Sequence, residues 1–358
     1  MSVFPVAKGC RQRMDGWRWN PHDNEHRMPG GQEAPSLGRR AEDMATETLN
    51  FDDRQPPACR GGAVAIGNFD GVHRGHLALL AELKQQAQRI GGPAVAVTFD
   101  PPPLQLLRPE RFQPSLTRIT DRAELIQANG ADHVVILHTT QKLLSLGPGD
   151  FFRAVVQDQL AARAMVEGSN FGFGHNREGT VETLAQLCRK ADIRLVVVPP
   201  VEWNGGIVSS SRVRTALLQG DVRDAADLLG RPYRLGGVVG PGRQRGQTLG
   251  FPTANLNGVE TLVPLDGVYA VRVHYRGQGW PGAANVGPNP TFGEHARKLE
   301  VHLIGFDGGL LAQELAVDFI ERLRDTRPFP SVVELTAQLR LDIERARHLA
   351  GIETQMKA

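Results

Sequence analysis

The chain has 358 residues, of which 41% are hydrophobic and 22% charged, and its formal net charge is +2 at pH 7. This composition is typical of a globular protein of about two or three domains, and a charge so close to zero gives no sign of a nucleic-acid or membrane-surface partner. No apolar run approaches the roughly 18 residues of a membrane span, and the N-terminus lacks the apolar core of a secretion signal.

The three cysteines, Cys10, Cys59 and Cys188, are widely spaced and form no CxxC pair. This usage argues against a disulfide framework and against a zinc site. It fits a protein of the reducing cytoplasm.

Residues 1–60 differ from the rest of the chain. The stretch "RQRMDGWRWNPHDNEHRMPGGQEAPSLGRRAEDM" mixes arginine, glycine, proline and acidic residues without any period. Such a segment buries too little apolar surface to offset the entropy lost on ordering. We therefore expect a disordered leader outside the catalytic fold, or an over-long gene start with translation beginning at Met44.

Residues 61–228 alternate between apolar strand-like runs and amphipathic helices. The helices are predicted in "GHLALLAELKQQAQRI", "ELIQANG", "GDFFRAVVQDQL", "TVETLAQLCRKA" and from "SSSRVR" onward. The predicted buried strands span residues 62–67, 93–99, 132–138, 162–168 and 193–200. Repeated strand–helix–strand units form a parallel sheet, so we predict a five-stranded doubly wound α/β domain. Its ligands should bind at the carboxyl ends of the strands.

Residues 229–350 have a different residue pattern, without the alternation of strands and helices. Short strand-like runs broken by glycine, proline and aspartate follow one another in "RLGGVVG", "GVYAVRVHY", "PGAANVG", "LEVHLIGF" and "ELAVDFI". They predict an antiparallel barrel or sandwich. A long C-terminal helix follows, whose apolar face carries Leu335, Leu339, Ile343 and Ala346.

Two histidines three residues apart open the first helix, in "GNFDGVHRGH". This spacing puts His73 and His76 on one side of the helix N-terminus, where the helix dipole and glycine-rich backbone amides favour anions. Imidazoles there can donate hydrogen bonds to a phosphate whose charge grows in a transition state. Two other interpretations are a pair of plain turn histidines, or a metal site that would need a third ligand.

Two further segments complete a pattern. "GSNFGFGHNREG" follows the fourth strand, and the serines of "SSSRVR" can cap the last helix of the domain, exposing N–H groups to phosphates. With "GNFDGVHRGH", they resemble the HxGH, flavin-loop and serine motifs of the nucleotidylyltransferase superfamily, in the form found in prokaryotic FAD synthetases. That family has a Rossmann-like sheet.

The resemblance implies roles for individual residues. His73 and His76 would be catalytic, and Asn68, Asn170, Phe171 and Arg177 would bind flavin. The residues implied to bind ATP are Gly67, Phe69, Asp70, Ser209, Ser210, Ser211 and Arg214. The chain departs from the family at two positions: Pro102 stands where a histidine is usual, and Ile207 where an arginine is frequent.

The second domain opens with "GPGRQRGQTLGFPTANL". It is not a P-loop, because no lysine precedes Thr248. "GFPTAN" resembles the PTAN motif of riboflavin kinases, which form a small antiparallel β-barrel with a C-terminal helix. The resemblance implies that Thr253 and Asn255 hold Mg²⁺ and that Glu300 in "LEVHLIGF" is the catalytic base. It also implies that three glycines contact ATP, namely Gly242, Gly246 and Gly250.

Together the motifs predict a bifunctional enzyme that phosphorylates riboflavin to FMN and adenylylates FMN to FAD. Its partners would be ATP, Mg²⁺ and flavins, with no nucleic acid or membrane, and it would be a monomer or weak oligomer. Three alternatives are a riboflavin kinase with an impaired adenylyltransferase domain, a nucleotidylyltransferase for another substrate, and a flavin-binding module without catalysis. Pro102 and Ile207 motivate the first of these.

Overall fold

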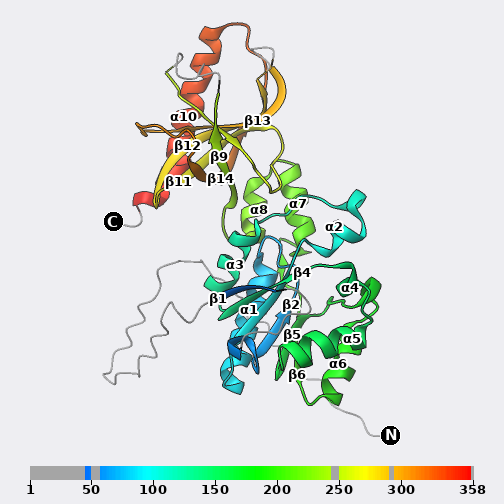
Figure 1. Cartoon of the computed structure of the whole chain (residues 1–358). Helices are drawn as coiled ribbons and strands as arrows, with labels where there is room; N and C mark the ends of the chain where they lie inside the picture. The colour runs from blue at the N-terminus through cyan, green and yellow to red at the C-terminus, as the bar shows by residue number, and fades with distance from the viewer. Residues whose placement is uncertain (1–44, 50–56, 243–249, 290–293, 356–358) are drawn as a thin grey trace, which may run out of the picture. The chain divides into compact units, whose positions relative to one another are not determined.

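The computed structural model describes residues 45–49, 57–242, 250–289 and 294–355. Within these ranges the chain forms a six-stranded parallel sheet and a closed barrel of six strands (Figure 1). No helix in the described ranges combines the length and apolar character required to cross a membrane.

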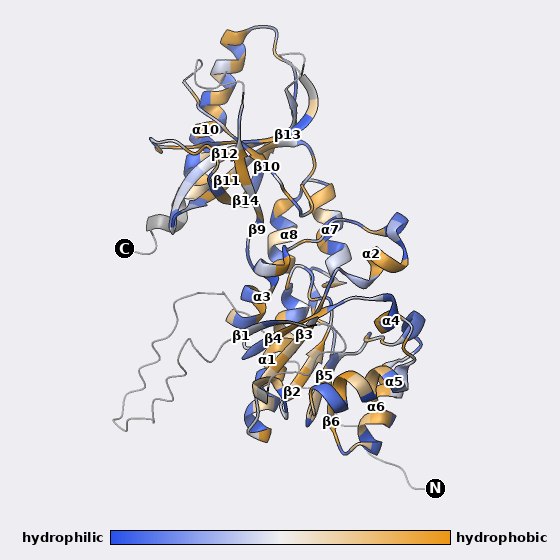
Figure 2. Cartoon of the chain, viewed as in Figure 1, coloured by the Kyte–Doolittle hydropathy of each residue, from blue (hydrophilic) through white to orange (hydrophobic). Residues whose placement is uncertain are grey.

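The parallel sheet has the strand order β1-β4-β3-β2-β5-β6. The strands are β1 (Ala45–Leu49), β2 (Ala63–Ile66), β3 (Ala94–Asp100), β4 (His133–His138), β5 (Ala164–Gly168) and β6 (Arg194–Val198). Its central strands are almost continuously apolar, as Figure 2 shows, because both faces of the sheet are covered. The strand order reverses between β2 and β5, which makes their carboxyl ends the expected place for a ligand.

Helices cover both faces of this sheet. Those that pack on it include α1 (Arg74–Ile90) and α3 (Ile119–Ala128) on one face and the π-helix η4 (Phe152–Gln159) and α6 (Val181–Lys190) on the other. The region also contains α2 (Pro103–Leu107), α4 (Gln141–Leu144), α5 (Pro148–Phe151), α7 (Ser210–Leu218) and α8 (Val222–Leu229). Ala63 and Ala65 of β2 pack with α1 and α3, whereas Val64 and Ile66 pack with η4 and α6. The alternation of side chains along a strand places successive residues on opposite faces. Short 3₁₀ turns and a small hairpin complete this region, namely η2 (Pro57–Cys59), η3 (Pro109–Arg111), η5 (His175–Arg177), β7 (Glu202–Trp203) and β8 (Gly206–Ile207).

The five predicted strands of the sheet are confirmed, but the sheet has a sixth strand among the described residues. β1 comes from the segment assigned to a disordered leader, and it pairs in parallel with β4 along the sheet edge. Thr46 is exposed and Glu47 half-buried. The strand pairs with a segment more than eighty residues away in the sequence, which composition could not reveal. Cys59, in the same predicted leader, is fully buried in the core. Residues 1–44 and 50–56 lie outside the described residues.

The barrel has the strand order β10-β13-β12-β11-β14-β9 and confirms the antiparallel prediction. Its strands are β9 (Tyr233–Gly240), β10 (Ala254–Asn257), β11 (Gly267–Tyr275), β12 (Gln278–Asn289), β13 (Glu294–Leu303) and β14 (Glu314–Arg324). The sequence did not predict β10, whose four residues belong to the PTAN motif. The C-terminal helix α10 (Val332–Gln355) buries Leu335, Ile343 and Ala346, with Leu339 half-buried, as predicted.

Candidate functional site

A cavity of about 620 Å³ opens at the carboxyl ends of β2 and β5. Its wall contains most of the described residues predicted to bind ATP or flavin in this domain. They are Gly67, Asn68, Phe69, His73, His76, Asn170, Phe171, Arg177, Ser209, Ser210 and Ser211. Segments more than a hundred residues apart in the sequence thus meet at the point where the strand order reverses.

His73 and His76 lie against each other in this cavity. Their ring centroids are 3.7 Å apart and the rings are nearly parallel. Burial lowers the pKa of His73 to about 4, and burial followed by the neighbouring charges of His73, Arg122 and Arg231 lowers the pKa of His76 well below its usual value. Both imidazoles are therefore neutral near pH 7. Nδ1 of each is buried without a hydrogen-bond partner among the described residues.

The serine motif begins α7 as predicted. Ser209 is the N-cap, and its hydroxyl accepts a hydrogen bond from the backbone N–H of Arg212 at 3.2 Å. Ser210 Oγ donates to the carbonyl oxygen of Asp70 at 2.9 Å, so it ties α7 to the histidine turn. Ser211 is exposed. The α7 N-terminus therefore faces the cavity with one serine capping, one bridging and one open to solvent.

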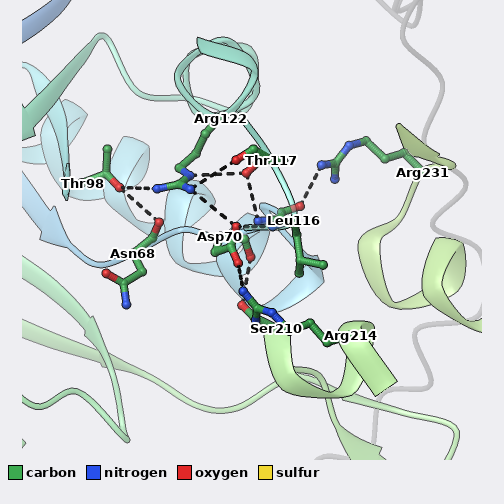
Figure 3. Close-up of polar contacts among 10 residues, drawn as sticks. Asn68, Asp70, Thr98, Leu116, Thr117, Arg122, Ser210, Arg214 and Arg231 are labelled. Atoms are coloured by element: carbon green, nitrogen blue, oxygen red, sulfur yellow. Dashed lines mark hydrogen bonds and ion pairs between the residues drawn. The ribbon is translucent and has the colours of Figure 1, made fainter. Parts of the chain in front are cut away.

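Asp70 and Arg214, both predicted to bind ATP, are not part of the described cavity wall. They form an ion pair with each other (Figure 3). The Asp70 carboxylate also accepts from the backbone N–H of Leu116 at 2.8 Å and lies 3.5 Å from the guanidinium of Arg122. In this structure Asp70 fixes the turn before His73, and Arg214 is engaged by that carboxylate.

The predicted flavin loop, residues 168–179, is held by local contacts. Phe171 stacks on Phe173 with ring centroids 5.3 Å apart, and Arg177 Nη2 donates to the carbonyl oxygen of Asn170 at 3.2 Å. A Cβ on Gly172 would lie 2.8 Å from Arg177 Nε. A glycine at this position therefore lets Arg177 close over the loop.

A second cavity, of about 410 Å³, opens on the barrel and is lined by Gly242, Thr253 and Asn255. Asn255 of β10 is the direct cross-strand partner of Glu300 in β13, and Glu300 faces Asn285 of β12 on its other side. Because cross-strand partners project from the same face of a sheet, these three side chains form one polar row. Leu299, Val301 and Leu303 point into the core instead.

The oxygen donors of this second cavity fit Mg²⁺. A threonine hydroxyl, an amide oxygen and a nearby carboxylate are hard ligands, and Mg²⁺ combines few protein ligands with waters and phosphate oxygens. A Cβ on Gly242 would lie 2.2 Å from Asn255 Nδ2, so only glycine allows the loop to approach Asn255 this closely. Gly250, at φ 84°, lies outside the cavity wall, and Gly246 lies outside the described residues.

Sequence comparisons match both halves of the chain. The family model for FAD synthetase matches residues 55–212, and the model for riboflavin kinase matches residues 229–350. A bifunctional riboflavin kinase/FMN adenylyltransferase of Pseudomonas fluorescens is 39% identical over 82% of this chain and 95% of its own length. The chain belongs to the bifunctional riboflavin kinase/FMN adenylyltransferase family.

Other members of the family are similarly close. Relatives of the same name from Escherichia coli K12 and Bacillus subtilis are 32% and 33% identical, over 94% and 90% of their lengths and 82% and 79% of this chain. A crystal structure from Streptococcus pneumoniae, named a macrolide-efflux protein, has the same fold with a TM-score of 0.76 and 32% identity. It covers 84% of this chain and 98% of its own.

Of the two departures from the family pattern, Ile207 lines the first cavity, whereas Pro102 is not among the residues of its wall. Pro102 precedes the short helix α2 as its N-cap and has no side-chain donor. Ile207 lines the cavity and is 55% exposed. Ile207 therefore presents apolar surface to the cavity at a position where the family often has an arginine.

Two charged residues beside this cavity were not predicted from sequence. Glu167 of β5 lines the cavity and accepts the backbone N–H of Ile66 at 2.8 Å, and burial raises its pKa well above the usual value. Arg122 is 3% exposed on the apolar face of α3, beside Ala123 and Ile126. In each case the sequence offered one signal that could have revealed the residue: an ionisable side chain within an otherwise apolar strand or helix face.

Proposed function

We propose that this chain makes FAD in two steps, phosphorylating riboflavin to FMN on the barrel and adenylylating FMN in the N-terminal cavity. The observation that carries the proposal is the presence of two cavities, each lined by its own motif set, in a chain that spans bifunctional relatives over nearly their whole length. A flavin-binding module without catalysis would need neither a polar row on the barrel nor the paired histidines.

In the first step, Glu300 takes the proton of the riboflavin 5′-hydroxyl, whose oxygen attacks the γ-phosphorus of ATP. The bond from that phosphorus to the β-phosphate oxygen breaks, and ADP leaves. Thr253 and Asn255 would hold Mg²⁺, which when bound neutralises charge on the phosphates. The cross-strand position of Glu300 beside Asn255 supports this assignment.

In the second step, a phosphate oxygen of FMN attacks the α-phosphorus of a second ATP, and pyrophosphate leaves. His73 and His76 donate hydrogen bonds to the phosphate oxygens as negative charge develops, and the α7 N-terminus adds backbone N–H groups. The loop at Asn170 and Phe171 positions the flavin. Arg214 reaches the phosphates only by leaving Asp70, so we propose that ATP competes with this ion pair.

The first test is a time course with purified protein, riboflavin, ATP and Mg²⁺, in which riboflavin, FMN and FAD are separated. We expect FMN to appear first and FAD to follow it. FMN alone, with added FMN also left unconverted, would mean that the first cavity lacks adenylyltransferase activity and that Pro102 and Ile207 matter.

We propose a cytoplasmic enzyme that acts as a monomer or weak oligomer on small molecules, without a nucleic-acid or membrane partner. Cys59 and Cys188 are free thiols buried in the core, which suits a reducing compartment that also supplies ATP. The net charge of +2 gives little attraction to polyanions.

A further inference from the structure

The turn that leads into His73 has an unusual backbone. Phe69, Gly71 and Val72 have φ angles of 46°, 81° and 40°. Positive φ is costly for a β-branched residue such as Val72, and strain of this kind persists only where surrounding contacts hold it. The position of the His73 imidazole therefore depends on whatever fixes this turn.

Two separate segments hold the first half of the turn (Figure 3). The backbone N–H of Leu116 donates to Asp70, Ser210 Oγ donates to the Asp70 carbonyl oxygen, and Thr117 Oγ1 accepts from the Gly71 N–H at 3.2 Å. These three hydrogen bonds involve Asp70 and the N–H of Gly71, and none involves a later group of the turn. They leave the carbonyl groups of Gly71 and Val72 to be satisfied from elsewhere.

Arg231 supplies those remaining contacts. Its Nη2 donates to the Gly71 carbonyl oxygen at 2.7 Å and its Nη1 to the Val72 carbonyl oxygen at 3.0 Å. A planar guanidinium satisfies two neighbouring acceptors at once, whereas a lysine ammonium is a point donor on a flexible stem. His73 is the next residue along the chain, so this fork fixes the backbone that carries the imidazole.

The backbone of Arg231 is itself fixed on both sides. Gly230 ends α8 in the left-handed conformation at φ 78°, after the buried Leu229. Tyr233 is 2% exposed, and its hydroxyl donates to the Leu262 carbonyl oxygen at 2.6 Å. Although burial lowers the pKa of Arg231 to about 10, the guanidinium stays charged near pH 7.

We propose that Arg231 is a positioning residue for FMN adenylylation, which holds the Gly71–Val72 carbonyls so that His73 and His76 meet the phosphates correctly. The inference rests on the proposed function of the first cavity. Arg231 lies beyond the FAD synthetase match at residues 55–212 and within the riboflavin kinase match at 229–350. The segment assigned to one activity thus supplies a residue that the other activity needs.

The test compares full-length Arg231→Met with the parent, using added FMN and ATP for adenylylation and riboflavin for phosphorylation. Misplacing catalytic groups relative to the reacting atoms lowers the rate by about tenfold to a hundredfold. We expect kcat for FAD formation to fall by that factor while KM for FMN and ATP changes by less than about threefold, because the lost geometry matters in the transition state. Riboflavin phosphorylation in the same sample should be unchanged.

Two further variants separate positioning from general structure. Arg231→Ala should regain part of its kcat when guanidinium chloride is added at non-denaturing concentration, and not with sodium chloride at equal ionic strength. Arg223→Met is the matched control, since Arg223 lies on α8, the helix that precedes Arg231, with a side chain 68% exposed and paired with Glu321. It should leave both activities at the parent level.

Three outcomes would overturn the inference. The first is an Arg231→Met enzyme whose kcat for FAD formation stays within about twofold of the parent. The second is an equal loss of both activities in Arg231→Met and in Arg231→Lys. That result would mean that Arg231 stabilises the fold in general and does not act on adenylylation in particular. The third is an Arg231→Met enzyme in which KM for FMN or ATP rises while kcat for FAD formation is unchanged. A parent enzyme without adenylylation would instead refute the proposed function itself.

Discussion

Glu300 and His73 are the side chains proposed to act in the two reactions. His73 lines the first cavity, and Glu300 is the cross-strand partner of Asn255, which lines the second. Glu300→Gln keeps the size of the side chain but cannot accept the hydroxyl proton, so FMN formation should fall by about 10²–10⁴-fold. FAD formation from added FMN should be unaffected. Both rates are measured by separating the flavins after reaction with ATP.

His73→Ala should have the opposite pattern. Removing one donor to a developing charge costs about 10²–10³-fold in kcat, so FAD formation should fall while FMN still accumulates from riboflavin. If either variant lowered both steps equally, the assignment of one reaction to each cavity would be wrong.

Glu167 is a buried carboxyl whose protonation should affect stability. Its pKa is raised well above the usual value by burial, so the folded chain keeps the proton whereas the unfolded chain loses it near pH 4.5. The stability contributed by Glu167 is therefore full below that pH and is lost as the pH rises toward the folded pKa.

Glu167→Gln cannot ionise and keeps an acceptor for the Ile66 N–H. The free energy of unfolding of the variant, relative to the parent, should increase with pH by up to about 1.4 kcal/mol per pH unit. Denaturant unfolding between about pH 5 and pH 8 measures this. Glu124→Gln, at an exposed position of α3, is the control. A difference independent of pH would contradict a protonated Glu167.

At the scale of elements, the apolar runs of the sequence predicted every strand of the parallel sheet except β1 and every strand of the barrel except β10. β1 and β10 have only five and four residues, so the strands that they pair with decide that they form. The position of β10 therefore depends on the residues that pack against it. Its Asn255 lies against Gly242, where a Cβ would approach within 2.2 Å of Nδ2.

Gly242→Ala should displace Asn255 and lower riboflavin phosphorylation by about tenfold or more, because small misplacements near reacting groups are costly. FAD formation from added FMN should not change. Gly309→Ala is a matched control, since a Cβ there meets no atom within 4 Å. Equal kinase activity in the two variants would show that the close approach of Gly242 to Asn255 has no role.

At the scale of the whole molecule, one apolar cluster combines α7 and α8 with the barrel. It contains Val213, Leu217 and Leu228 of the helices together with Tyr233 and Phe319 of the strands. Buried side chains in one cluster lose their contacts together. The stability of the two activities should therefore be linked even though their chemistry is separate.

Leu228→Ala tests this link, because Leu228 is fully buried in α8. A Leu→Ala change in a core costs about 2–5 kcal/mol, so the temperature of half-inactivation should fall for both activities. Leu218→Ala, at a position 45% exposed on α7, should leave it nearly unchanged. A fall confined to one activity would contradict a shared cluster.

The sequence by itself determined the two-part organisation, the parallel sheet, the antiparallel barrel and the motif residues found in the walls of the two cavities. Those features follow from local periodicity and from short motifs whose chemistry is carried by neighbouring residues. The tertiary structure decided that Asp70 pairs with Arg214, that Glu167 is buried beside the ligand cavity, and that Arg231 holds the turn before His73. These contacts join residues about a hundred or more positions apart, and burial, which sets their charge and strength, exists only once the chain has folded.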